Sequence, residues 1–284
     1  MTDNQAKRKN KRCFGEYLST GIVDKCVNSE KLAAYGVCRP YLDDFYIVNY
    51  KNWIKNNFNA EMGWMEKNLA VRRDLRTRFP LAQSVIVVAD NYYLNKPRKQ
   101  NTLKISRYAW GDDYHQVLLK KLKRIIQGLK KHEPTIEAFP YVDTGPVLEK
   151  ALAIEAGVGW MGKNSCIIVP DFGSYCFLGV IIINKKIPTE FPKIEPKCGT
   201  CTNCMSSCPT GALEKPHVLN ANKCLSYFSI EKKGDFTVQE QKWLQDWLYG
   251  CDICQEVCPW NKKWAGTTRE ISYFNRIEML ERSP

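Results

Sequence analysis

Cysteine spacing is the feature that most limits how this chain can fold. Eight of its thirteen cysteines fall between residues 198 and 258. The first group has the spacing C-x₂-C-x₂-C-x₃-C-P, the second has C-x₂-C-x₃-C-P, and one cysteine lies between them. In ferredoxins with two clusters, a run of the first kind ligates [4Fe–4S] cubes, and its fourth cysteine ligates the other cluster. The spacing therefore predicts a small ferredoxin-like domain with two [4Fe–4S] clusters.

The same rule divides the eight cysteines between the two clusters. We expect the first cluster to be held by Cys198, Cys201, Cys204 and Cys258. We expect the second cluster to be held by Cys208, Cys224, Cys251 and Cys254. Zinc and disulfides are the two alternatives. Four-cysteine zinc sites usually combine two separated C-x₂-C pairs, and a disulfide framework belongs to secreted proteins, whereas this sequence shows no secretory signal.

Composition indicates an ordinary globular protein with a marked positive charge. The apolar fraction is 44% and the charged fraction is 25%, and no stretch approaches the ~18 apolar residues of a membrane span. Residues 1–12, MTDNQAKRKNKR, resemble a disordered basic arm more than a targeting peptide. We therefore expect a cytoplasmic protein without a membrane partner. The net charge of +12 suits a polyanionic partner such as nucleic acid, although a lysine-rich proteome would also produce it.

Strand and helix signals alternate before residue 190, which predicts an α/β (α+β) domain in front of the cluster domain. Aromatic and β-branched residues favour a strand at 41–50. The apolar run 84–89 predicts a strand buried on both faces. Residues 117–129 have the spacing of an amphipathic helix, which Asp112 or Asp113 can cap. Two further strands are expected at 166–170 and 175–184.

Two more segments carry expectations about helices. Asp143 or Thr144 can cap a helix that has Pro146 in its first turn and ends at Gly157. On the residues alone, capping therefore explains Asp143, and a place on the first turn of a helix explains His115. Between the cysteine groups, four apolar residues at helical spacing predict a helix that covers the clusters: Trp243, Leu244, Trp247 and Leu248.

Several separated motifs, taken together with the cysteine runs, resemble one enzyme family. They are Arg107-Tyr108-Ala109-x-Gly111-x-Asp113-Tyr114-His115, Asp143-x-x-Pro146-Val-Leu-Glu-Lys150, Gly157-x-Gly159-Trp160-x-Gly162-Lys163 and Tyr249-Gly-Cys251-Asp-x-Cys254-Gln-x-x-Cys258-Pro-Trp-Asn261. In these motifs and their order, between about residues 30 and 262, the sequence is similar to epoxyqueuosine reductase, the cobalamin-dependent iron–sulfur enzyme of tRNA queuosine synthesis.

The resemblance implies a fold, a reaction and a set of site residues. It implies a cobalamin-binding α/β domain related to reductive dehalogenases, and reduction of epoxyqueuosine to queuosine at the wobble position of tRNA. Electrons would come from an external donor such as flavodoxin or ferredoxin and pass through the clusters to cobalamin. By motif position Asp143 matches the proton donor, and Tyr114 and His115 match its neighbours. Candidates for cobalamin contact are Arg107, Asp143, Gly159, Trp160, Gly162 and Lys163.

The expected organisation has four parts. Residues 1–12 form the basic arm, 13–190 the cobalamin-binding catalytic domain, 191–262 the ferredoxin-like domain and 263–284 a tail. Many relatives continue into a helical-repeat domain that helps to hold tRNA, whereas this sequence ends 26 residues after Cys258. We therefore expect a short form, acting as a monomer on the anticodon loop of tRNA.

Two other functions compete with this interpretation. A corrinoid reductase could act on a substrate other than tRNA, such as an organohalide, but enzymes of that kind are typically exported and this sequence has no export signal. A ferredoxin-type electron-transfer protein would contain iron and sulfide without a corrinoid. That interpretation leaves the long segment before the clusters without a purpose.

Overall fold

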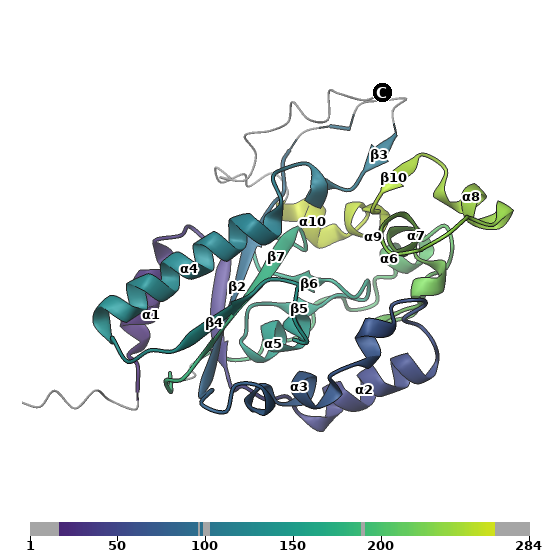
Figure 1. Cartoon of the computed structure of the whole chain (residues 1–284). Helices are drawn as coiled ribbons and strands as arrows, with labels where there is room; N and C mark the ends of the chain where they lie inside the picture. The colour runs from purple at the N-terminus through teal and green to yellow at the C-terminus, as the bar shows by residue number, and fades with distance from the viewer. Residues whose placement is uncertain (1–16, 96, 99–102, 189–190, 265–284) are drawn as a thin grey trace, which may run out of the picture.

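The computed structural model describes residues 17–95, 97–98, 103–188 and 191–264. Its centre is a four-stranded sheet with the order β1-β2-β7-β4, in which each neighbouring pair is antiparallel (Figure 1). The strands are β1 (Ala34–Cys38), β2 (Ser84–Asn91), β4 (Ala138–Tyr141) and β7 (Cys176–Ile183). Side chains on both faces of β2 are buried, which confirms the strand predicted at 84–89.

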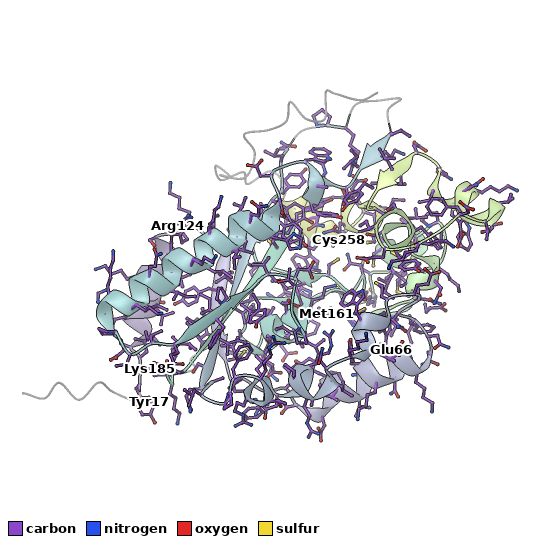
Figure 2. The ribbon with its side chains drawn as sticks, in the orientation of Figure 1. Tyr17, Glu66, Arg124, Met161, Lys185 and Cys258 are labelled. Atoms are coloured by element: carbon purple, nitrogen blue, oxygen red, sulfur yellow. The ribbon has the colours of Figure 1, made fainter. Side chains whose placement is uncertain are left out.

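Helices cover both faces of this sheet (Figure 1). One face packs against α1 (Thr20–Asn28) and α4 (Tyr114–His132), and the other packs against α5 (Glu149–Glu155). The amphipathic helix predicted at 117–129 is confirmed as the main part of α4. Its buried side chains recur at helical spacing toward the sheet, whereas Arg124 projects outward and pairs with Glu30 (Figure 2).

Of the two predicted helix caps, one is confirmed and the other is wrong. The side chain of Asp113 accepts a hydrogen bond from the backbone N–H of His115 at 3.0 Å and caps α4, which confirms one of the two predicted caps. The predicted cap of α5 at Asp143 or Thr144 is wrong, because the helix begins at Glu149 and Leu148 occupies its N-cap position. Gly157 follows the end of α5 with φ +66°, as predicted for a residue that ends a helix.

The strand predicted at 41–50 is wrong. This segment forms most of helix α2 (Asp44–Lys55). Its aromatic residues recur at helical spacing, and the helix lies on the surface with Phe45 70% exposed. Strand propensity reflects packing on a half-buried pleated surface, and no strand among the described residues pairs with residues 44–50. α2 instead packs near the cluster region, where Trp53 Nε1 donates to the carbonyl oxygen of Leu219 at 2.6 Å.

The helix predicted across residues 243–248 is wrong in its second half. α8 (Val238–Leu244) ends at Gln245, which has φ +47°. Trp247–Tyr249 then forms β10, which pairs in parallel with β3 (Lys104–Ile105) from the first half of the chain. This pairing turns Trp247 inward and leaves Leu248 54% exposed. Because the partner strand is far away in the sequence, local spacing did not reveal it.

The strands expected at 166–170 and 175–184 are present in shorter form. β6 (Ile167–Ile168) pairs with β5 (Trp160–Met161) in a small hairpin, while β7 joins the central sheet. Ile168 of β6 packs beside Cys258. The remaining short elements are η1 (Gly63–Glu66), α3 (Leu69–Arg73), η2 (Leu75–Thr77), η3 (Arg107–Ala109), α6 (Asn203–Ser206), β8 (Leu213–Lys215), β9 (Val218–Leu219), η4 (Ala221–Lys223), α7 (Leu225–Ile230), α9 (Ile253–Glu256) and α10 (Pro259–Trp264).

In the part that the structure describes, no helix has both the length and the apolar character needed to cross a membrane. The predicted basic arm at 1–12 and nearly all of the predicted tail, 265–284, lie outside the described residues.

Candidate functional site

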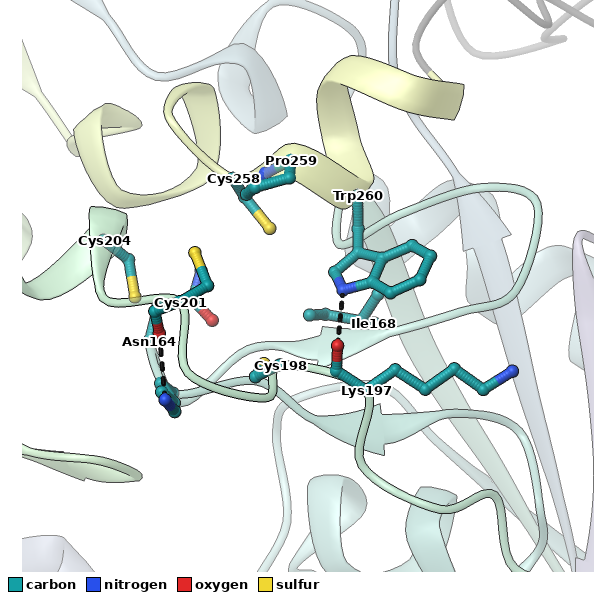
Figure 3. A pocket seen from close by; sticks show the side chains of 10 residues that line it. Asn164, Ile168, Lys197, Cys198, Cys201, Cys204, Cys258, Pro259 and Trp260 are labelled. Carbon is teal, nitrogen blue, oxygen red and sulfur yellow. Dashed lines mark hydrogen bonds between the residues drawn. The ribbon is translucent and has the colours of Figure 1, made fainter.

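The first four cysteines predicted to share a cluster line one cavity of about 170 Å³. Figure 3 shows the thiols of Cys201, Cys204 and Cys258 directed toward a common space, with Cys198 at its floor. Short helices place them: α6 begins between the second and third cysteine, and α10 begins directly after Cys258. Trp260 closes one wall, and its Nε1 donates to the carbonyl oxygen of Lys197 at 3.2 Å.

The other four predicted ligands also lie close to one another. The charge on Cys251 is influenced by Cys224 and Cys208, and the charge on Cys254 by Cys251 and Cys224. Cys224 is the N-cap residue of α7, so a helix start brings this distant cysteine to the pair before α9. The structure therefore places the first four thiols around one cavity and the other four near one another, while their assignment as cluster ligands stays a prediction.

Both sets have the chemistry that iron–sulfur clusters need. None of the twelve cysteines in the described residues forms a disulfide. Burial raises the pKa of the Cys251 thiol to about 12 and also raises the pKa of Cys204 and Cys258, and repulsion from neighbouring thiolates adds to this effect. Such a group holds its negative charge only when cations replace the protons, as iron does when it coordinates thiolate.

A second group of side chains meets at the start of α4. The hydroxyl of Tyr114 donates to Asp143 Oδ2 at 2.6 Å, and His115 Nε2 lies 3.9 Å from the same oxygen. Asp143 follows β4 by two residues with φ +52°, and its side chain is 66% exposed. Burial, followed by the hydrogen bond to Asp143, raises the pKa of Tyr114 far above its usual range. The phenol therefore stays protonated and donates to the carboxylate.

Neighbouring groups fix the orientation of both rings. The Tyr114 ring stacks on Phe177 of β7 with centroids 4.2 Å apart and an interplanar angle of 1°. His115 Nδ1 lies 2.8 Å from Asp113 Oδ1, the carboxylate that also caps α4. Because Asp113 engages Nδ1, the ring presents Nε2 to Asp143. The helix cap thus positions a group of the site.

Tyrosine rings connect this group to the cluster region. Tyr108 contacts Tyr114 edge-on with centroids 6.2 Å apart, and it contacts Tyr249 at 6.0 Å. Tyr249 precedes Cys251 by two residues and is partly exposed. The candidate site therefore lies beside the second set of cysteines.

Two of the residues expected to contact cobalamin make other contacts. Arg107 packs its guanidinium over the rings of Tyr93 and Trp110, 5.2 and 4.6 Å from their centroids. Lys163 Nζ donates to the carbonyl oxygens of Gly199 and Cys201 at 2.6 and 2.9 Å. Lys163 therefore holds the loop of the first cysteine group.

The segment around Trp160 also packs differently from expectation. Trp160 is 1% exposed and packs beside Cys258, Trp260 and Trp264. It supports the wall of the first cavity and presents no surface to a ligand. An added Cβ at Gly159 would lie 2.5 Å from the carbonyl oxygen of Ile168, and one at Gly162 would lie 2.7 Å from Asn164 Oδ1. These glycines allow the chain to approach itself closely.

Asp252 lies near the candidate site and was not predicted from the sequence. It lies between two expected ligands, is 0% exposed, and accepts hydrogen bonds from Arg98, the hydroxyl of Ser106 and, at 2.7 Å, the backbone N–H of Arg107. These contacts join the cluster loop to the segment that leads into Tyr114. The sequence feature that could have identified it is an acidic residue between the two cysteines of a C-x₂-C pair.

Comparison with known proteins identifies the family. Residues 72–144 match the model described as epoxyqueuosine reductase QueG, and residues 197–261 match that of a 4Fe-4S double cluster binding domain. An epoxyqueuosine reductase from Synechocystis sp. is 44% identical over 233 residues, which cover 80% of this chain and 78% of the relative. The chain belongs to the epoxyqueuosine reductase family.

Solved structures of epoxyqueuosine reductases share this fold. One, described as bound to an epoxyqueuosine-modified tRNA stem loop, has a TM-score of 0.80 and 32% identity, and the match covers 89% of this chain and 67% of that one. Another, from Bacillus subtilis, has a TM-score of 0.78 and 29% identity with coverage of 89% and 69%, and is described with a catalytic aspartate loop swung out of the active site. These matches confirm the predicted family, the α/β fold and the double-cluster region. The expected relation to reductive dehalogenases stays a prediction.

Proposed function

We propose that this chain reduces epoxyqueuosine to queuosine at the wobble position of tRNA, as an oxidoreductase that uses two [4Fe–4S] clusters and cobalamin. The observation that carries the proposal is the group in which the Tyr114 hydroxyl donates to Asp143 while His115 lies beside the same carboxyl. It lies within the part of the chain that matches the epoxyqueuosine reductase model and beside one set of cysteines. A family member described in complex with an epoxyqueuosine-modified tRNA stem loop supports the substrate.

The two sets of cysteines are the proposed cluster ligands. The first cluster is assigned to Cys198, Cys201, Cys204 and Cys258, which line one cavity. The second is assigned to Cys208, Cys224, Cys251 and Cys254, which influence one another's charge. Four thiolates around each cube is the ligand set that [4Fe–4S] clusters require.

Polar and aromatic side chains surround Asp143. Asp143, Tyr114 and His115 expose hydrogen-bonding atoms there, and the rings of Tyr108 and Tyr249 lie alongside. Glu149 Oε1 adds a buried oxygen with no hydrogen-bond partner among the described residues. When bound, cobalamin supplies a strongly reducing cobalt centre. Of the residues predicted to contact it, Asp143 is the one whose side chain is open to a ligand.

Asp143 is the proposed proton donor to the epoxide oxygen. Tyr114 occupies Oδ2 as a donor, so Oδ1 is the oxygen that can carry a proton toward a ligand. His115 Nε2 lies 3.9 Å from Oδ2 of the same carboxyl and forms part of the polar surroundings of Asp143.

The first cavity is the proposed entry point for electrons. Its lining includes the lysines Lys163 and Lys197 and no acidic side chain among the described residues. A basic rim next to a cluster suits an acidic carrier protein such as a flavodoxin or a ferredoxin, because opposite charges speed the encounter of two proteins. The second cluster then lies between the entry point and Asp143.

The decisive experiment replaces Asp143 with Asn in anaerobically prepared protein loaded with iron, sulfide and cobalamin. We expect about eight irons and one cobalt per chain in both wild type and variant, as two cubes and one corrinoid require. Conversion of epoxyqueuosine in tRNA should fall by at least about 100-fold in the variant, the usual contribution of a general acid. Asp171→Asn is the matched control, because Asp171 is also an exposed aspartate with positive φ.

Each alternative gives a different result. Turnover that survives Asp143→Asn would remove Asp143 as the acid and leave the reductase intact. Eight irons with no cobalt retained by the wild type would favour a ferredoxin-type electron carrier. Full loading without any reaction on modified tRNA would point to a corrinoid reductase that acts on another substrate.

A further inference from the structure

Residues 251–261, here called the cluster segment, carry expected ligands of both clusters and two buried amide side chains. Gln255 directly follows Cys254 and is 9% exposed, and Asn261 is 3% exposed. Neither of them is an expected ligand. A buried amide needs hydrogen-bond partners, and both amides find partners on one buried residue of the α/β domain, Ser174.

Five hydrogen bonds connect Ser174, Gln255 and Asn261, and together they are called the Ser174 network. Asn261 Oδ1 accepts from the backbone N–H of Ser174 at 2.6 Å. Asn261 Nδ2 donates to Ser174 Oγ at 2.9 Å and to the carbonyl oxygen of Gln255 at 2.8 Å. Gln255 Nε2 donates to the carbonyl oxygen and to Oγ of Ser174, at 3.0 and 3.1 Å. The backbone N–H, the carbonyl oxygen and the hydroxyl of Ser174 therefore all pair with the cluster segment.

The loop that carries Ser174 is closely fitted to the cluster segment. The preceding residue, Gly173, has φ +76°, and an added Cβ there would lie 2.1 Å from Asn261 Oδ1. The loop is also held from the side of the central sheet, where Asn91 Nδ2 donates to the carbonyl oxygen of Tyr175 at 3.0 Å. Ser174 thus has a fixed place between the sheet and the cluster segment.

Contacts continue from Ser174 to the candidate site. Strand β7 begins two residues after Ser174, and Phe177 of this strand stacks on the Tyr114 ring with centroids 4.2 Å apart. The hydroxyl of Tyr114 in turn donates to Asp143. The cluster segment is therefore connected to the proposed proton donor by the network, one end of β7, a ring stack and a hydrogen bond.

We propose that the Ser174 network fixes the cluster segment relative to Tyr114 and Asp143. Its three members are positioning residues, because they act through the ligands of the clusters and through Phe177. Electrons cross between separated centres at a rate that falls steeply with distance, and a proton donor must lie within hydrogen-bond reach of its acceptor. Turnover needs both conditions at once. The inference rests on the proposed function, in which the clusters supply electrons and Asp143 supplies a proton.

The test compares Gln255→Met and Asn261→Ala with the wild-type holoprotein. Gln255→Met keeps a side chain of similar length and removes its two hydrogen bonds, whereas Asn261→Ala removes three. Asn184→Ala is the matched control at the opposite end of β7. Asn184 Oδ1 accepts from the backbone N–H of Glu137 at 2.9 Å, and its Nδ2 donates to the carbonyl oxygen of Thr135 at 3.1 Å.

Hydrogen exchange followed by mass spectrometry tests the connection without turnover. In Gln255→Met and Asn261→Ala we expect about eight irons, as two cubes require. Exchange should be faster in the cluster segment and also in the peptides that contain Phe177 and Tyr114, because lost contacts favour local opening. Asn184→Ala should leave these peptides as in wild type. Faster exchange confined to the cluster segment would overturn the proposal. Loss of iron from both variants would also overturn it, since the network would then serve cluster assembly.

Turnover of tRNA that contains epoxyqueuosine tests what the connection does. We expect kcat to fall by about 10- to 100-fold in both variants, since misplacement by about 1 Å can cost about 100-fold in rate. The KM for tRNA should stay unchanged. A wild-type kcat in both variants would overturn the proposal. A wild-type protein without any turnover would instead contradict the proposed function, and hydrogen exchange would still decide whether the network connects the two regions.

Discussion

At the scale of single residues, the site depends on backbone positions that few side chains tolerate. Asp143 has φ +52°, in the left-handed region where Asp and Asn are more frequent than other non-glycine residues. This conformation sends the carboxylate back toward Tyr114 and away from α5, whose first turn it was predicted to cap. The sequence predicted a helix cap at Asp143, and its actual partner, Tyr114, could not be predicted from the local sequence.

Glu149 gives a prediction about pH at the same scale. Burial, together with nearby Asp143, raises the pKa of this carboxyl from 4.5 to about 7. Between these values the folded chain binds more protons at Glu149 than the unfolded chain, so the contribution of Glu149 to stability falls as pH rises through this window. Glu149→Gln removes that loss. We compare the free energy of unfolding of the variant with that of wild type at each pH. The advantage of the variant should be larger at pH 8 than at pH 5 by up to about 3 kcal/mol.

Urea unfolding of the anaerobic holoprotein at the two pH values measures this difference. Other carboxyl groups titrate equally in both proteins, so they cancel in the comparison. If the free energies of unfolding of variant and wild type differ by the same amount at pH 5 and at pH 8, Glu149 is ionised in the folded protein across this pH range.

At the scale of elements, sequence patterns predicted what is determined locally. The cysteine spacing and the apolar period of α4 depend on residues three or four positions apart, and both predictions match the structure. The predictions are wrong where a segment far away in the sequence determines the local structure. β10 is a strand because Lys104–Ile105 lies beside it, and Trp160 is buried because α10 covers it. The glycines near Trp160 likewise serve contacts between segments.

Gly36 supplies a prediction for this scale. It lies in β1 beneath the end of α5, and an added Cβ would lie 1.8 Å from the carbonyl oxygen of Ala156. Because this obstacle is backbone, Gly36→Ala must shift the helix away from the sheet. We expect a loss of about 3 kcal/mol, at the upper end of the usual cost of overpacking a core. Gly63→Ala is the control, since a Cβ there meets nothing within 4 Å. Equal stability of the two variants in urea unfolding would contradict this packing.

At the scale of the whole molecule, the fold joins the catalytic and cluster regions and places positive charge beside them. Buried Asp252 pairs with Arg98 and accepts a hydrogen bond from the segment before Tyr114, which ties the candidate site to the second set of cysteines. α4 begins at this site, and its outer face carries exposed lysines at positions 120, 123, 130 and 131. Lys121, on the inner side, is buried in a 2.6 Å ion pair with Asp90.

This distribution predicts how the proposed tRNA substrate is held. Exposed lysines that neutralise phosphates release counterions, so binding of a tRNA anticodon stem loop should weaken as salt rises. Between 50 and 200 mM salt, two or three such contacts lower affinity by at least about tenfold. The net charge of +12 acts at long range, and the lysines of α4 lie along a helix whose first residue, Tyr114, contacts Asp143.

Fluorescence anisotropy with a labelled stem loop measures how steeply the affinity falls with salt. Lysine variants show which surface causes this dependence. Lys120→Ala combined with Lys123→Ala should reduce the slope of log affinity against log salt by up to about two, one for each phosphate contact removed. Lys51→Ala combined with Lys55→Ala on α2 removes the same charge from another surface and should leave the slope close to wild type. An equal reduction in both pairs would mean that net charge, and not the face of α4, attracts the RNA. A flat salt response in the wild type would mean that phosphate contacts contribute little to binding, which would then depend on recognition of the modified base.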